Sequence, residues 1–169
     1  MQFKVGEKVV YPNHGVGVIE QITHSPLNGR PENFYLVRIF SNGLRVTVPC
    51  LNAQSVGLRR LIRPAEVTRV IGSLENGKIE LHRDWKSRFK QNSEKMRTGS
   101  LDAVAQVFKT LVDLSHNKPL SFREKKMLDH ARRLLIVELA TVRNVSEITV
   151  EKALEKALSK PRGRRLKSP

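Results

Sequence analysis

The segment around Trp85 is the part of this sequence whose residue types are best suited to binding a nucleic acid. Trp85, the single tryptophan, stands in the run Arg-Asp-Trp-Lys-Ser-Arg-Phe-Lys over residues 83–90. An apolar ring among cations suits the DNA minor groove, where the ring wedges between base pairs while lysines and arginines hold phosphates. The alternative is that Trp85 packs on Phe89, one helical turn on, and the cations form a solvated face. Composition and spacing leave both interpretations open.

A second basic cluster follows a helix-start signal. Ser121 and Glu124 have the spacing of a capping box, in which the serine caps a helix and the glutamate lies three residues on. The helix that this box opens carries the cations Arg123, Lys125, Lys126, Arg132 and Arg133. Any one of them could belong to an ordinary polar face, but their local excess favours a surface that faces phosphates.

Residues that could catalyse a reaction or hold a metal do not form a recognisable set. Cys50 follows Pro49 at a predicted strand end without an adjacent base, which is typical of an unreactive cysteine. The five histidines do not pair with each other or with Cys50 at metal-ligand spacing. The run Gly15 to Val18 lacks the third glycine and the Lys-Ser/Thr of phosphate-binding loops. The sequence therefore predicts a protein that is not an enzyme and that uses no metal, cofactor or small-molecule substrate.

Overall charge agrees with a polyanionic partner. The chain has 169 residues with a formal net charge of +15. Residues 1–60 hold 7 basic and 3 acidic side chains, against 24 and 13 in residues 61–169, so the second part is the better candidate for a phosphate contact. One cysteine, the absence of a signal peptide and the absence of an apolar stretch of about 18 residues predict a cytoplasmic protein without membrane contacts.

Hydrophobic periodicity changes along the chain from that of strands to that of helices. Over residues 1–60, apolar residues alternate with polar ones in short runs, and Asn42-Gly43 predicts a type I′ turn in a tight hairpin. Over residues 61–159, apolar residues recur every three or four positions. The predicted fold is α+β with two domains: a small Tudor/SH3-like β-barrel over 1–60 and a compact all-α domain over 61–159. Residues 160–169 predict a basic disordered tail.

The sequence resembles the CarD/CdnL family of bacterial RNA-polymerase-binding transcription regulators. Residues 3–15 read Phe-Lys-Val-Gly-Glu-Lys-Val-Val-Tyr-Pro-Asn-His-Gly, as such proteins begin. The resemblance returns in Trp-Lys-Ser-Arg-Phe-Lys at residues 85–90 and in Ser-Phe-Arg-Glu-Lys-Lys-Met-Leu at residues 121–128. Transcription-repair coupling factors carry a module similar to the first one, but here the resemblance runs through both modules, over about residues 1–159.

The resemblance implies a mechanism on promoter DNA. The β module binds the β subunit of RNA polymerase. The helical module lies at the upstream edge of the melted promoter, where Trp85 wedges into the minor groove and stabilises the open complex. Lys90 and Lys125 match family positions that contact or approach DNA, and Lys86, Arg88 and Lys126 are similar in charge and placement. Binding to DNA is expected to be largely independent of base sequence.

On the polymerase side, the resemblance implies contacts by Leu27, Arg45, Thr47 and Pro49. Family members can carry arginines where this chain has Ser25 and Thr47, and Arg45, two residues before Thr47 on the same strand face, could supply one of these charges. The rival interpretation is a nucleoid-type protein that binds nucleic acid non-specifically and happens to carry a Tudor-like module.

Overall fold

The computed structural model of the protein describes residues 2–27, 29–76 and 84–159, and its chain divides into two compact units. The first comprises Met1–Leu61 with Arg97–Gly99, and the second Ile62–Met96 with Ser100–Pro169. The predicted α+β fold class, with antiparallel strands followed by helices, is confirmed. The tail predicted over 160–169 lies outside the described residues. Within the described parts, no helix is long and apolar enough to cross a membrane.

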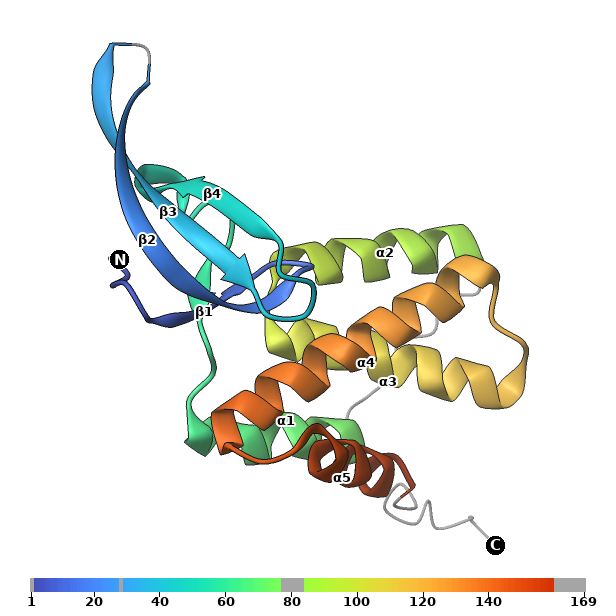
Figure 1. The fold of residues 1–169 in the computed structure, drawn as a ribbon. Coiled ribbons are helices and arrows are strands. Elements are labelled where there is room, and N and C mark those ends of the chain that lie inside the picture. The colour runs from blue at the N-terminus through green and yellow to red at the C-terminus, as the bar shows by residue number, and fades with distance from the viewer. Residues whose placement is uncertain (1, 28, 77–83, 160–169) are drawn as a thin grey trace, which may run out of the picture. The chain divides into compact units, whose positions relative to one another are not determined.

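The first unit contains a five-stranded antiparallel sheet (Figure 1). Its strands are β1 (Lys8–Tyr11), β2 (Gly15–Leu27), β3 (Arg30–Ile39), β4 (Arg45–Pro49) and β5 (Arg59–Arg60), with a 3-10 turn at Cys50–Asn52 after β4. The spatial order is β4-β3-β2-β1-β5, so β4 and β5 form the two edges. Residues 24–27 of β2 pair with residues 30–33 of β3 beyond the points where β1 and β4 pair with these strands, so this end of the hairpin is a two-stranded ribbon.

Alternation along these strands sends one set of side chains into a small core. The core is made by Phe3, Val9, Ile19, Tyr35, Val37, Ile39, Val48, Ala53 and Leu58. The hydroxyl of buried Tyr35 also accepts a hydrogen bond from the backbone N–H of Phe3 at 3.0 Å, which ties the N-terminal segment to β3.

The turn between β3 and β4 differs from the predicted one. A type I′ turn needs positive φ at both central residues, but of Asn42 and Gly43 only Gly43 has a positive φ, of 69°. The chain closes a longer loop, in which the N–H groups of Ile39 and Gly43 donate to the carbonyls of Leu44 and Ile39. Asn42 serves through its side chain, whose Oδ1 accepts the N–H of Leu44 at 2.9 Å.

The second unit is built from five helices: α1 (Pro64–Asn76), α2 (Trp85–Thr98), α3 (Leu101–Asn117), α4 (Phe122–Arg143) and α5 (Glu147–Ser159). Serines cap two of them, because Ser100 Oγ accepts the N–H of Ala103 and Ser121 Oγ accepts the N–H of Glu124. Asn144 ends α4 in the left-handed conformation with φ 52°. The helix start predicted at Ser121 is therefore confirmed.

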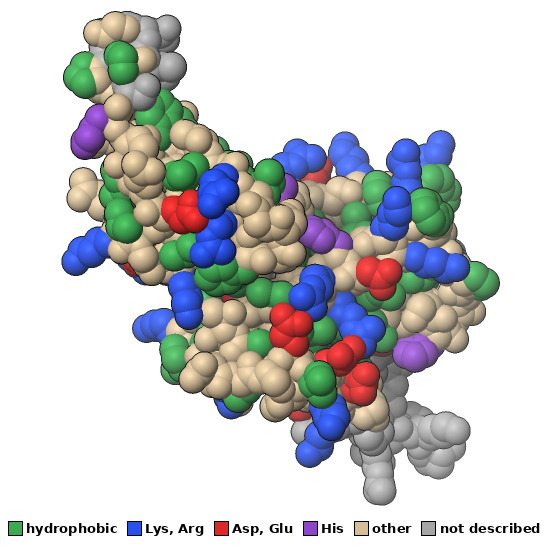
Figure 2. All heavy atoms as spheres, viewed as in Figure 1, with side chains coloured by type: hydrophobic (Ala, Val, Ile, Leu, Met, Phe, Trp, Pro, Cys, Tyr) green, Lys and Arg blue, Asp and Glu red, His purple; other side chains and the backbone are tan. Residues whose placement is uncertain are grey.

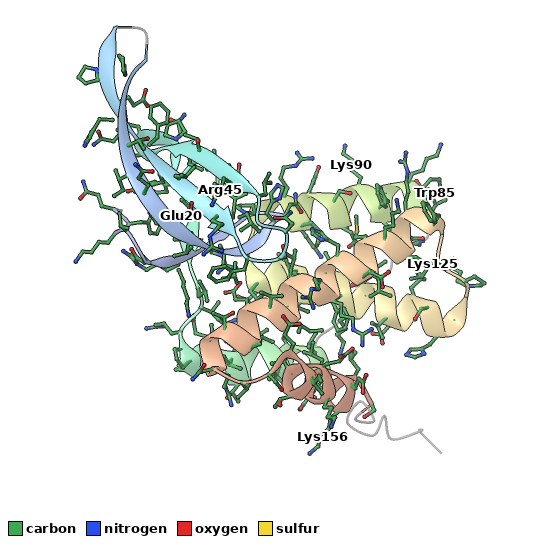
Figure 3. The ribbon with its side chains drawn as sticks, in the orientation of Figure 1. Glu20, Arg45, Trp85, Lys90, Lys125 and Lys156 are labelled. Atoms are coloured by element: carbon green, nitrogen blue, oxygen red, sulfur yellow. The ribbon has the colours of Figure 1, made fainter. Side chains whose placement is uncertain are left out.

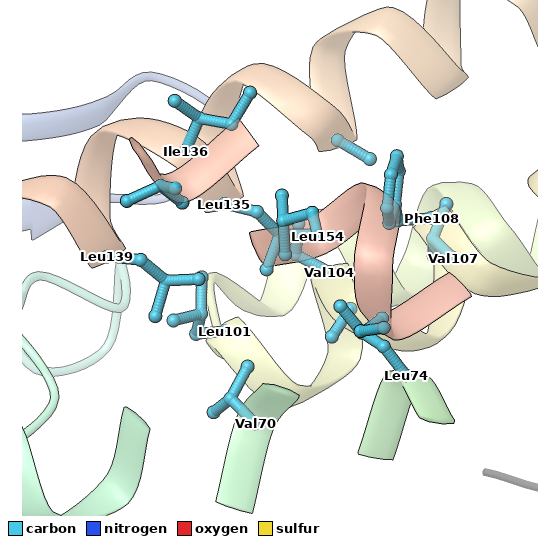
Figure 4. Packing of buried hydrophobic residues seen from close by; sticks show 14 of the residues in the cluster. Val70, Leu74, Leu101, Val104, Val107, Phe108, Leu135, Ile136, Leu139 and Leu154 are labelled. Carbon is cyan, nitrogen blue, oxygen red and sulfur yellow. The ribbon is translucent and has the colours of Figure 1, made fainter. Parts of the chain in front are cut away.

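Apolar faces of these helices meet in one core (Figure 4). Leu111 and Leu135, from α3 and α4, are completely buried, and Val70, Leu74 and Leu154 pack into the same cluster from α1 and α5. Helix α2 contributes to this core through Met96 alone, since its other two buried residues, Arg88 and Asn92, are polar.

Candidate nucleic-acid interface

Trp85 lies at the first position of α2, and Asp84 fixes the helix start there. The Asp84 carboxylate accepts the backbone N–H of Lys86 and the hydroxyl of Ser87, each at 3.1 Å. A carboxylate in this position satisfies the free N–H groups of a first helical turn. The local sequence therefore places the tryptophan at the very end of a helix.

The side chain of Trp85 is exposed over 47% of its surface. Phe89, one turn on, is half-buried, with the guanidinium of Arg123 from α4 lying 5.8 Å from its ring centre. An apolar ring as large as that of tryptophan is usually covered when it belongs to a core. The exposure therefore favours the interpretation that Trp85 is available to a partner over the one in which it is a core residue.

Four exposed lysines share this end of the helical unit with Trp85: Lys86 and Lys90 on α2, and Lys125 and Lys126 on α4. Trp85 and Lys125 lie at the starts of α2 and α4, whose first turns are joined by an ion pair between Arg88 and Glu124, while Lys90 stands farther along α2 (Figure 3). Blue and green side chains mix over this region of the surface (Figure 2). Two helix N-termini with several cations form an electrostatic environment that favours phosphate.

Arg88 differs from the other predicted DNA contacts because it is buried. Its guanidinium binds the Glu124 carboxylate of α4 with Nε–Oε2 at 2.9 Å and Nη2–Oε1 at 3.2 Å, and the two side chains are 5% and 4% exposed. Because Arg88 is buried in this pair, its side chain is not part of the surface that the four lysines form. A signal was available: Arg88, Asn92 and Met96 recur every four residues, as the inner face of a helix requires.

The pKa of Glu124 reports on this pair. Burial raises the pKa, but the hydrogen bonds and charge of Arg88, together with the bonds to Ser121, lower it below the ordinary value of 4.5. A carboxyl whose pKa is lower in the folded state stabilises the fold above its unfolded pKa and loses that contribution as the pH falls through the folded one.

We therefore expect acid to weaken the helical unit partly through Glu124. The difference in melting temperature between wild type and Glu124→Gln should be constant above about pH 5 and shrink below pH 4.5, where the carboxyl of the unfolded chain takes up a proton before that of the folded protein does. Circular dichroism at 222 nm from pH 7 to pH 3 measures it. Glu66, whose pKa is also lowered, is present in both proteins and cancels. A difference that does not depend on pH would contradict the expectation.

The basic cluster predicted on α4 divides into two parts. Arg132 binds Glu151 at 2.5 Å and lies 3.7 Å from Glu155, while Arg133 binds Glu147 at 2.8 Å, so both arginines join α4 to α5. Within this cluster, Arg123, Lys125 and Lys126 lie in the first turns of α4, near Trp85, while Arg132 and Arg133 are paired with acidic residues of α5.

Phe122 is a residue of this surface that the sequence interpretation missed. It is the first residue of α4, is 71% exposed, and has the Nζ of Lys126 4.6 Å from its ring centre. An aromatic residue directly after a helix cap and followed by cations repeats the arrangement around Trp85, which is the signal that could have identified it.

The residues predicted to contact polymerase lie mainly on the edge strand β4. Arg45 and Thr47 are exposed and Pro49 is half-buried, and because they are two residues apart they share one face of the strand. Leu27 is the last residue of β2, and its side chain is outside what the structure describes.

Glu20 holds Arg45 in place on this strand. Register shifts between Ile19 and Gln21, so Glu20 is an extra residue in β2, and such bulges re-aim side chains. The Glu20 carboxylate binds Arg45 Nε at 2.9 Å and Arg38 Nε at 2.7 Å (Figure 3). Hydrogen bonds and charge from Arg45, with those from Arg38, lower the pKa of Glu20.

Chemically reactive groups do not gather anywhere in the described parts of the chain. Burial raises the pKa of the Cys50 thiol, despite a hydrogen bond from Tyr35, and this disfavours the reactive thiolate form. Among the described residues, no three His, Cys, Asp or Glu side chains stand close enough to hold a metal ion.

Comparisons with known proteins agree on one family for both units. The model of the CarD-like/TRCF RID domain matches residues 3–62, and that of the CarD C-terminal domain matches residues 69–155. A putative transcription factor, YdeB of Bacillus subtilis (strain 168), is 30% identical over 145 residues, which cover 86% of this chain and 95% of that protein. The solved structure of CdnLNt from Myxoccoccus xanthus is 44% identical over 37% of this chain and 87% of its own, with a TM-score of 0.32.

Proposed function

This chain belongs to the CarD/CdnL family of transcription regulators, and we propose that it stabilises the open complex of RNA polymerase at promoters. In this proposal the sheet unit binds the β subunit of the polymerase. The helical unit contacts promoter DNA at the upstream edge of the melted region, and Trp85 wedges into the minor groove there. A protein with these partners works at the nucleoid.

The observation that carries the DNA half is the exposed ring of Trp85 at a helix start among Lys86, Lys90, Lys125 and Lys126. A wedge needs an apolar side chain that protrudes and cations that hold the backbone on either side of the base step. A ring inserted at the edge of the bubble would have to leave before the strands could re-pair, so closing would become slower. Such contacts read phosphates and groove shape, which agrees with binding that depends little on base sequence.

The polymerase half rests on β4. This strand is an edge of the sheet, and within the described part of the chain it pairs on one side alone, with β3. An open edge offers N–H and C=O groups to an extended segment of a partner, which then lengthens the sheet. The exposed side chains of Arg45 and Thr47 stand along the same edge and would select the partner.

Two weak contacts suffice in this arrangement. Once the sheet unit is bound to polymerase, the helical unit meets DNA as an intramolecular partner at a high effective concentration. Binding to free duplex is therefore expected to be weak and to fall steeply with salt, because it rests on phosphate contacts.

We expect Trp85→Ala to lose most of the increase in open-complex lifetime that the wild-type protein produces. Stacking of an aromatic side chain on a base is worth about 1–3 kcal/mol, which corresponds to roughly 5-fold to 160-fold in lifetime. The measurement is the decay of open complexes of bacterial RNA polymerase on a ribosomal-RNA-type promoter after addition of a competitor, without protein, with wild type and with the variant.

Two variants control this experiment. Lys156→Ala removes an exposed cation from α5, away from Trp85, and should keep the full lifetime (Figure 3). Thr47→Glu places a carboxylate on the outward face of β4 and should lose polymerase binding and lifetime together while keeping the affinity for free DNA. If wild type leaves the lifetime unchanged and binds DNA equally well with and without polymerase, the proposal fails in favour of a nucleoid-type DNA-binding protein.

A further inference from the structure

Helix α2 is held to the rest of its unit in an unusual way. Its fully buried residues are Arg88, Asn92 and Met96, so the one fully buried apolar side chain of α2 lies near its C-terminal end, and near its start only Phe89 is half-buried. The Nδ2 of Asn92 is buried and has no hydrogen-bond partner among the described residues, so this amide group adds little to the attachment. The start of α2, where Trp85 lies, therefore depends on what Arg88 binds.

What Arg88 binds is Glu124, through two parallel hydrogen bonds of 2.9 and 3.2 Å. A bidentate guanidinium–carboxylate pair fixes orientation as well as distance. Arg88 is the fourth residue of α2 and Glu124 the third of α4, so the pair joins the first turns of both helices.

Glu124 is itself held in place. Its backbone N–H donates to Ser121 Oγ at 3.2 Å, and that hydroxyl donates to Glu124 Oε1, also at 3.2 Å. The carboxylate that receives Arg88 is thus attached to the cap of α4, and it has little freedom to follow α2 if that helix moves. Trp85 stands three residues before Arg88, and Lys125 directly follows Glu124.

We propose that the buried Arg88–Glu124 pair is a positioning pair, which holds the start of α2 beside the start of α4 so that Trp85 and Lys125 act on the same stretch of DNA. Neither Arg88 nor Glu124 touches DNA in this proposal. This inference rests on the proposed function, which supplies the role of Trp85. It explains how the ring, although it lies at the end of a helix, is held in a defined direction. A ring without a fixed direction would lose conformational entropy on entering the groove, and this loss would weaken its binding.

Two variants separate positioning from stability. Arg88→Lys keeps a positive charge but loses the planar fork that makes two parallel bonds. The double variant Arg88→Met/Glu124→Leu keeps the site buried and removes the directional bonds, and such apolar replacements often recover stability. Leu135→Ala is the matched control, since it weakens the core on α4 about three helical turns beyond Glu124 and leaves the ion pair in place.

The experiment measures four quantities for each full-length variant at a temperature where all are folded: polymerase affinity, melting temperature, open-complex lifetime and the time-resolved anisotropy of the single tryptophan. We expect Arg88→Lys and the double variant to keep polymerase affinity, to lose most of the lifetime gain, and to show a larger amplitude of fast Trp85 motion. Leu135→Ala should show a lower melting temperature with normal lifetime and normal Trp85 anisotropy.

The outcomes distinguish this inference from the proposed function. If the double variant keeps both the wild-type lifetime and the wild-type anisotropy, the positioning role is overturned while the wedge stands. If wild type and Trp85→Ala give the same lifetime, the proposed function fails, and the anisotropy of Trp85 in the free protein still decides whether the pair fixes the start of α2. If Leu135→Ala loses the lifetime gain as fully as Arg88→Lys does, stability alone explains the effect and the inference is overturned.

Discussion

Arg88→Met is expected to lower the free energy of unfolding of the helical unit by about 3–5 kcal/mol, the usual cost of removing one partner of a buried ion pair. The loss has two parts. The variant forfeits two charge-assisted hydrogen bonds, and it leaves the Glu124 carboxylate buried with only Ser121 beside it. Equilibrium unfolding in urea at pH 7, followed by helical circular dichroism and by Trp85 fluorescence, measures the change.

An exposed ion pair provides the comparison. Arg133→Met breaks the ion pair between Arg133 and Glu147, two side chains that are each about half exposed. Because water screens such pairs, this variant should lower the free energy of unfolding by no more than about 1 kcal/mol. The double variant Arg88→Met/Glu124→Leu should regain most of the stability that Arg88→Met loses. Equal losses for Arg88→Met and Arg133→Met would mean that the Arg88–Glu124 pair is not buried in solution.

Leu135→Ala is expected to destabilise the helical unit by about 2–5 kcal/mol, the range for removing a leucine side chain from a close-packed core. Leu135 is completely buried among residues of α1, α3 and α5 (Figure 4), and the surrounding helices cannot close the resulting cavity without moving their other contacts. The same urea titration measures this loss.

The adjacent leucine gives a control that differs by one position. Leu134 lies only partly buried against the same core, so Leu134→Ala removes less buried surface and should cost clearly less. A loss at Leu134 equal to that at Leu135 would contradict the burial described for this helix face. Leu135→Ala should leave polymerase binding unchanged at temperatures where it is folded, because the residue reaches neither surface of the proposed function.

Local patterns in the sequence were enough to predict the elements and their caps. The period of apolar residues separates strands from helices, and Ser121 caps α4 as its spacing to Glu124 indicated. These features depend on residues that are neighbours in the chain. The Asn42–Gly43 turn was predicted wrongly, because the choice among hairpin loops depends on how the two strands pair as well as on the turn residues.

The fate of single cations could not be predicted in the same way. Arg88 and Lys90 are two residues apart in one basic run, yet Arg88 is buried and Lys90 exposed. What separates them is Glu124, 36 residues from Arg88 in the chain, and its position is known only when α2 and α4 have packed. The ion pairs of Arg132 and Arg133 with acidic residues of α5 likewise depend on packing between helices that the local sequence does not specify. The number of cations in a segment indicates that a basic surface exists. Which of these cations lie on that surface depends on the ion pairs that form when the helices pack.

The open edge at β4 also bears on self-association. An exposed strand edge is a template on which a second copy of the same chain could pair and begin an aggregate. Here the strand is short, it begins with the charge of Arg45, and it ends at Pro49, which has no N–H to offer. Two copies would in addition bring together chains that each carry a net charge of +15. These features disfavour pairing between copies of this chain at the edge that we propose for the polymerase contact.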